Sequence, residues 1–272
     1  MATRLVSAIW VLSVLCVQHP GNATTVTIGH DSLEQTEKRE AERIWDQAIE
    51  AKGGRERLYA VRNVVISSKG IYRTSHNRGN TIRQEEFYVF PDKFWAWSDY
   101  RPDVFGLRVE MVNWETKAHY LVSPDAPRDE PRGMPTGGSD QIMEGRIYYL
   151  LETKWLKPVV MKAIKGRVES RLVDIVRTKV YDQLTDFVFD RESHLLVQVR
   201  TYHGPDTSKK PADVVTFSDY TEANGLKVPR KVVFDDGMAY EVSFQFNVTY
   251  DPGVLLNPPT IEAGAEAWKP KK

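Results

Sequence analysis

The sequence predicts one mostly antiparallel β domain accompanied by two helices. Apolar and polar residues alternate with a period of two in most segments between residues 61 and 250, which is typical of half-buried strands. Short turns rich in Gly, Pro, Asn and Asp separate these segments, as hairpins require. Only two segments have helical spacing, too few for a parallel sheet, which needs a crossover between strands.

The start of the chain has the pattern of a secretory signal peptide. Arg4 gives a positive start, and the apolar run of residues 5–17 is too short to span a bilayer. The small residues Gly21 and Ala23 precede a suitable cleavage point before Thr24. We therefore expect a signal peptide at residues 1–23, a single domain at residues 24–272, and export to the periplasm, with association with the outer membrane left open.

Cys16 offers an alternative, because lipidated bacterial proteins are cut just before a cysteine. The processing enzyme needs a small residue before that cysteine and finds Leu15, which favours ordinary cleavage. If Cys16 is removed with the signal, the mature chain has no cysteine. A disulfide framework, a thiolate metal site and a cysteine nucleophile are then excluded.

The first helix is expected at residues 35–52, followed by two glycines, which helix ends favour. Residues 123–139 are rich in Pro and Gly and predict a long loop. A second helix is expected from a possible N-cap at Asp140 to Pro158, with a wide apolar face that covers the sheet. The expected strands are residues 61–71, 81–90, 94–98, 107–113, 118–123, 159–164, 168–178, 185–189, 195–202, 214–220, 226–234 and 238–250.

The charges of the chain balance, with 37 Lys and Arg residues against 37 Asp and Glu residues. The basic residues are scattered along the chain, so nucleic acid is not an expected partner. The sequence contains no HExxH pattern, phosphate loop, dinucleotide fingerprint or Gly-x-Ser-x-Gly elbow, and we expect no metal and no cofactor. Four acidic residues are expected at solvated strand and turn positions instead of forming a catalytic pair: Asp182, Asp186, Asp190 and Glu192.

Three strings, TDFVFDRESHLL, VTFSDYTEANGLKVPRKVVF and YDPGVLLNPP, resemble the LolA/LolB-like group of outer-membrane lipoprotein carriers and sorting proteins. AIEAKGGRERLYAVRNV is similar to the opening of the more distant members of that group. The resemblance covers roughly residues 40–260 and reports fold more firmly than activity. It implies an open, strongly curved half-barrel of about 11 antiparallel strands, with the two helices over its concave face. It also implies a hollow that shields the acyl chains of a lipid or lipoprotein.

Such a hollow needs more apolar surface than packing alone requires. Burial of ten acyl methylenes is worth ~8 kcal/mol before ordering costs, enough for micromolar binding. Each candidate side chain could instead belong to an ordinary core packed against the two helices. The expected ligand-binding residues are Trp95, Trp97, Phe105, Leu107, Val109, Met111, Trp114, Ile147, Leu151, Trp155, Tyr240, Phe244 and Phe246.

The leading hypothesis is therefore an exported carrier or binding protein for lipid or lipoprotein acyl chains, and not an enzyme. The first alternative is an enzyme on the same scaffold, acting on a small hydrophobic or glycosidic substrate through carboxylates and tyrosines. The second is an envelope interaction module that docks a protein partner on a free sheet edge without a small ligand.

Overall fold

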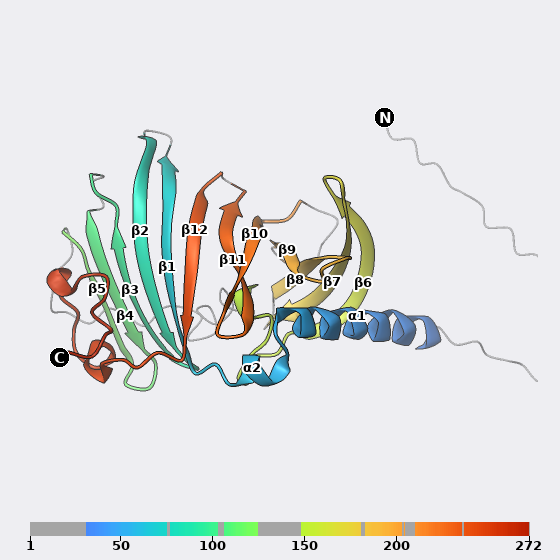
Figure 1. The fold of residues 1–272 in the computed structure, drawn as a ribbon, viewed down its shortest axis with the longest axis horizontal. Coiled ribbons are helices and arrows are strands. Elements are labelled where there is room, and N and C mark those ends of the chain that lie inside the picture. Colours follow the sequence, from blue (N-terminus) through green and yellow to red (C-terminus); the bar gives the residue numbers. More distant parts are fainter. Residues whose placement is uncertain are drawn as a thin grey trace, which may run out of the picture.

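The computed structural model describes residues 31–74, 77–102, 106–124, 148–180, 183–202, 204, 210–235 and 237–271 (Figure 1). The expected signal peptide therefore lies outside the described residues, as do most of the loop expected at 123–139 and the first part of the second expected helix. Phe105 and Ile147 also lie outside them.

The described chain begins with two helices, continues through twelve strands and ends with two short 3-10 helices. The helices are α1 (Asp31–Lys52), α2 (Arg55–Tyr59), η1 (Pro252–Leu255) and η2 (Ile261–Ala263). The strands are β1 (Asn63–Thr74), β2 (Asn77–Val89), β3 (Lys93–Asp99), β4 (Leu107–Asn113), β5 (Ala118–Val122), β6 (Val159–Val168), β7 (Arg171–Val180), β8 (Gln183–Asp190), β9 (Leu196–Thr201), β10 (Asp213–Ala223), β11 (Leu226–Phe234) and β12 (Ala239–Phe246).

All twelve strands belong to one antiparallel sheet in the order β5-β4-β3-β2-β1-β12-β11-β10-β9-β8-β7-β6. The first strand pairs with the last one, so both ends of the strand region meet in the middle of the sheet. Strands β5 and β6 are the two edges, and the sheet is open. The expected open antiparallel half-barrel is confirmed, with twelve strands in place of about eleven.

The sheet has a seam between β11 and β12. These strands share three paired residues, whereas β1 and β2 share eleven. Beyond the hairpin, residues 226–229 pair only with β10 and residues 242–246 pair only with β1. The sheet therefore divides into two halves that are joined by a short hairpin, and in Figure 1 the half that ends in β6 curls over α1.

Helix α1 packs on one face of the sheet, which we call the inner face. Its apolar residues recur at spacings of three and four, and all of them are at most 3% exposed. They form one hydrophobic cluster with residues from ten of the twelve strands, which requires the sheet to wrap around the helix. These α1 residues are Ala41, Ile44, Trp45, Ala48 and Ile49.

The second expected helix is only partly present in the described residues. Residues 148–150 are helical, but residues 151–158 form bends and extended chain. Leu151 has a φ of 67°, a left-handed conformation that ends a helix of L-residues. The apolar spacing therefore continued past the point where the backbone leaves the helix, and the prediction of helix up to Pro158 was wrong.

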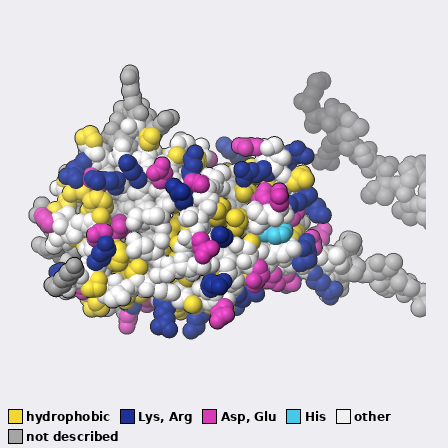
Figure 2. All heavy atoms as spheres, viewed as in Figure 1, with side chains coloured by type: hydrophobic (Ala, Val, Ile, Leu, Met, Phe, Trp, Pro, Cys, Tyr) yellow, Lys and Arg dark blue, Asp and Glu magenta, His cyan; other side chains and the backbone are white. Residues whose placement is uncertain are grey.

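Charged side chains of both signs lie next to one another over most of the face that Figure 2 shows. This arrangement agrees with the equal numbers of basic and acidic residues in the sequence. Most of the visible surface therefore has no strong electrostatic field of a single sign.

Candidate functional site

The inner face carries a nearly continuous row of aromatic rings. Phe246 stacks on Phe244, whose ring lies 5.1 Å from that of Tyr149, and Tyr149 also contacts Phe217. On the other side of the seam, Tyr148 and Trp45 contact Phe187, which stacks on Phe189. The sheet rings reach this face because alternate residues of a strand point the same way. The row gives the inner face an aromatic, apolar lining.

Two neighbouring tyrosines of residues 148–156 connect the two parts of this row. We call residues 148–156 the plug, because their side chains occupy the inner face beside α1. Leu150 and Leu151 are each 2% exposed and belong to the same cluster as α1. The inner face is therefore packed with side chains in this structure.

The plug is held mainly by side chains. Among the backbone hydrogen bonds between described residues, its one bond outside the helical turn is internal, from the Thr153 N–H to the Leu156 carbonyl. It therefore adds no strand to the sheet, and it can leave without breaking a β-ladder. Backbone pairing holds every strand, whereas packing and one carboxylate hold the plug.

That carboxylate is Glu152. It accepts hydrogen bonds from Trp45 Nε1 at 3.1 Å, from Arg55 Nε at 2.5 Å and from the Tyr59 hydroxyl at 2.8 Å. Burial alone would raise its pKa, but the three donors, led by Arg55, outweigh burial and leave the pKa of Glu152 below its ordinary value. The charged carboxylate therefore ties the plug to α1 and α2.

Lys52 is the one buried lysine among the described residues, at the end of α1. Its side chain is 4% exposed, and its ammonium nitrogen lies 6.0 Å from the ring centre of Tyr220. No carboxylate of the described residues pairs with it, and burial lowers the pKa of Lys52 to about 7. The Tyr220 hydroxyl is already used, since it donates to the Leu196 carbonyl at 2.5 Å. A neutral amine close to physiological pH thus faces the rim of the inner core.

The residues that the sequence marked for ligand binding separate onto the two faces of the sheet. Phe244, Phe246 and Leu151 belong to the inner cluster, and Trp114 and Tyr240 pack against it. Trp95, Val109 and Met111 belong to a second cluster on the outer face, with Trp97 beside it. Leu107 shares the outer orientation of Val109 because it lies two residues away on β4. Trp155 is 40% exposed and stacks on Phe90.

Strand register decides this separation. Phe94 pairs with Val112 on the inner face, whereas Trp95 pairs with Met111 on the outer face. The two tryptophans of β3 share a face, as their spacing requires, but it is the face opposite α1. The structure therefore does not bring Trp95, Trp97, Val109 and Met111 together with the aromatic row.

The C-terminal segment covers these outer residues, and no pattern in the sequence predicted this cover. The Asp251 N–H donates to the Trp268 carbonyl at 2.8 Å, which closes residues 251–268 into one compact loop. Leu255 and Trp268 are its buried anchors. The Asn113 side chain donates to the Leu255 carbonyl at 2.9 Å, and the Trp268 indole N–H donates to Glu85.

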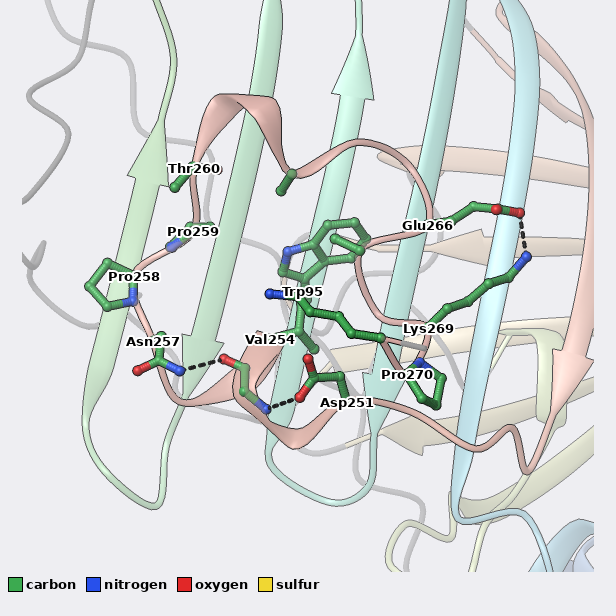
Figure 3. Close-up of a pocket in the computed structure, with 14 residues that line it drawn as sticks. Trp95, Asp251, Val254, Asn257, Pro258, Pro259, Thr260, Glu266, Lys269 and Pro270 are labelled. Carbon is green, nitrogen blue, oxygen red and sulfur yellow. Dashed lines mark hydrogen bonds and ion pairs between the residues drawn. The ribbon is translucent and has the colours of Figure 1, made fainter.

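A pocket of about 500 Å³ lies inside this loop, with Trp95 at its floor (Figure 3). Its polar lining groups mostly bind one another. Asp251 accepts from the Gly253 N–H, Asn257 donates to the Gly253 carbonyl, and Lys269 pairs with Glu266. The Trp95 indole N–H has no partner among the described residues, but the ring is fully buried. With few free polar groups to orient a ligand, this pocket is a weaker candidate than the inner face.

Four carboxylates are buried among the described residues, and only Glu152 faces the inner core. Asp186 was expected to be solvated, but it is 2% exposed, because Arg177 binds both its oxygens and Tyr202 donates to it at 2.8 Å. Asp99 likewise binds Arg83 and Arg101 on the outer face. The described residues contain no cluster of His, Cys, Asp and Glu that could hold a metal ion.

No described helix combines the length and the apolar character that crossing a bilayer requires.

No family model and no curated protein matches the chain. Solved structures do resemble it at low identity. A LolA superfamily protein from Nitrosomonas europaea is 9% identical with a TM-score of 0.46, over 75% of this chain and 91% of the other. A putative outer membrane lipoprotein-sorting protein domain from Vibrio parahaemolyticus is 12% identical with a TM-score of 0.44, over 78% and 95%. A DUF1329 family protein from Desulfovibrio piger is 8% identical with a TM-score of 0.43, over 79% and 96%.

The likeness to LolA-like proteins that the sequence strings predicted is thus found among solved structures. At these identities and TM-scores it assigns no activity to this chain. Any functional conclusion has to come from the site itself.

Proposed function

We propose that this protein is an exported lipid-binding protein of the cell envelope, which holds a long acyl chain on the inner face in exchange for the plug. The observation that carries the proposal is the aromatic row of the inner face, closed by a segment that lacks backbone pairing to the sheet. An acyl chain of a free lipid or of a lipoprotein fits this chemistry equally well. A role in lipoprotein sorting belongs to the same proposal.

The energies of the exchange are comparable. Three buried leucines and two half-buried tyrosines of the plug contribute about 10 kcal/mol by burial. A chain of about 12 methylenes gains ~10 kcal/mol on burial. Shorter chains would not displace the plug, because their gain does not cover its loss. The proposed ligand is therefore a long acyl chain.

A binding role is favoured over catalysis on the same scaffold. An acid–base mechanism on the inner face needs a carboxylate with free hydrogen-bonding capacity near the substrate. Glu152 is the inner buried carboxylate of the described residues, and three donors already bind it. The apolar ring surface and this occupied carboxylate together support a binding protein.

The test is a titration of purified, lipid-stripped protein with a fluorescent long-chain fatty acid, competed with palmitate. We expect saturable binding. Glu152→Ala should tighten it about tenfold, because a loss of about 1.4 kcal/mol of plug attachment makes the exchange that much more favourable. Asp46→Ala is the matched control, since it removes the exposed carboxylate that also pairs with Arg55 at 2.8 Å and should leave the affinity unchanged.

Two results would contradict the proposal. One is the absence of fatty-acid binding together with the absence of lipid in native mass spectra of protein purified from its own envelope. The other is binding whose affinity is the same in the wild type and in Glu152→Ala, which would place the ligand away from the plug.

A further inference from the structure

The apolar side chains that remain exposed are concentrated at one end of the sheet. Among the described residues, seven large apolar side chains are at least 36% exposed, and five of them fall between residues 155 and 172. The most exposed of these is Val159 at 61%. Scattered single apolar residues on a surface need no explanation, but a cluster of them does. The five residues are Trp155, Val159, Met161, Ile164 and Leu172.

The same stretch is strongly basic. Residues 154–172 contain six Lys and Arg residues and one acidic residue, Glu169, although the whole chain has no net charge. The basic residues are scattered over the chain as a whole, but they are concentrated in this segment. At the end of the molecule that carries β6 and β7, Figure 2 shows apolar side chains between Lys and Arg side chains, with Asp and Glu side chains among them. The basic residues are Lys154, Lys157, Lys162, Lys165, Arg167 and Arg171.

These cations form no close ion pair with other described residues, although Lys165 acts electrostatically on Glu40 and Arg171 acts on Asp190. No ion pair within the described part of the chain involves any of the six. Lys157 lies 4.9 Å from the ring centre of Tyr59, a contact that leaves its charge unneutralised. The positive charge of this end is thus available to an external anion.

The position of β6 makes the cluster accessible. β6 is an edge strand that pairs only with β7, and six of its ten residues are exposed, although Val160 and Ala163 pack against the inner cluster beside α1. Lysines on an edge strand often serve only to prevent strand pairing between molecules. That purpose would not require Val159, Met161 and Ile164 to remain exposed beside them, because apolar edges promote the same pairing. Apolar and cationic side chains together suit a lipid surface with anionic headgroups.

We infer that residues 154–172 dock on the surface of an anionic lipid bilayer, with the basic residues on the headgroups and the exposed apolar ones in the interfacial layer. The net charge of this segment favours an anionic bilayer over a partner strand, since strand addition relies on backbone groups. The inference rests on the proposed function, because the docking segment overlaps the plug at residues 154–156. Docking would therefore place the plug, and the inner face behind it, beside the lipid.

Vesicle sedimentation at pH 7 tests the inference. We expect binding to vesicles of equal parts phosphatidylglycerol and phosphatidylcholine, loss of that binding in 0.5 M NaCl, and no binding to pure phosphatidylcholine. The triple variant Lys162→Glu, Lys165→Glu, Arg167→Glu should bind at least 100-fold more weakly, since each basic residue near an anionic leaflet strengthens binding about fivefold. Val159→Ser with Met161→Ser should weaken binding about tenfold through the lost apolar contact.

The matched control is Lys227→Glu, Arg230→Glu, Lys231→Glu, which makes the same change in net charge on the exposed residues of β11. It should bind anionic vesicles as the wild type does. Equal loss in both triple variants, or equal binding to neutral and anionic vesicles, would overturn the inference. So would a β6-dependent dimer in analytical ultracentrifugation without vesicle binding, which would make a second copy the occupant. Fatty-acid binding in solution should be unchanged in the β6 variant, so failed docking and failed lipid binding are separate results.

Discussion

Replacing Lys52 by methionine should stabilise the protein at neutral pH, and the gain should shrink as the pH rises. The lysine is 4% exposed, faces the ring of Tyr220 and has no carboxylate partner in the described residues. Burial lowers its pKa from 10.5 to about 7. Methionine has a similar length and keeps the apolar contacts, but it carries no charge into the core.

The direction in which stability changes with pH follows from proton binding to Lys52. Between pH 7 and pH 10.5 the unfolded chain keeps the proton on Lys52 and the folded chain releases it, so the stability of the wild type rises with pH in that window. At ~1.4 kcal/mol per pKa unit, burial of this lysine costs about 4 kcal/mol at pH 7 and about 1 kcal/mol at pH 9.5. Tyr220 sets the upper limit of the useful range, because burial raises its pKa and its own effect opposes folding above pH 10.

The assay is guanidinium unfolding followed by tryptophan fluorescence at pH 7, 8, 9 and 9.5. Lys52→Met should be more stable than the wild type at pH 7, with a difference that falls by about 3 kcal/mol at pH 9.5. The control is Lys227→Met, because that lysine is exposed and pairs with an exposed glutamate. A difference between Lys52→Met and the wild type that stays constant across this pH range would refute the reasoning.

Two further predictions concern the outer loop and the plug. Trp268→Ala should lower the free energy of unfolding by about 3 kcal/mol, because it removes a ring that is 3% exposed and the hydrogen-bond donor to Glu85. Thermal melting measures this loss. The control Lys269→Ala should change stability by less than about 1 kcal/mol. A loss in Lys269→Ala as large as in Trp268→Ala would contradict this account of the anchor. Since the pKa of Glu152 lies below its ordinary value of 4.5, its contribution to plug attachment is complete above that pH and is lost as the pH falls through the folded-state value. Fluorescent fatty-acid binding should therefore strengthen on acidification below pH 4.5 in the wild type but not in Glu152→Gln, and parallel pH profiles would count against a plug held by this carboxylate.

Much of the fold follows from local patterns. Strands β4 and β11 begin and end at the residues that alternation predicted, and α1 contains the whole predicted first helix. Side chains of a strand alternate between faces regardless of what lies on either face, so the period alone predicts each strand. The helical spacing of Ala41, Ile44, Trp45, Ala48 and Ile49 likewise predicted the buried side of α1.

The candidate site could not be predicted from local patterns, because it depends on contacts between residues that lie far apart in the chain. Alternation placed Trp95 and Trp97 on one face, but only the packing of α1 and of residues 251–268 decided that this face is the outer one. Glu152 gave no local signal, because its three partners lie 93 to 107 residues away in the chain. The sequence by itself therefore determined the strands and the first helix. The tertiary structure decided which apolar face is closed by a removable segment, because that depends on contacts between residues far apart in the chain.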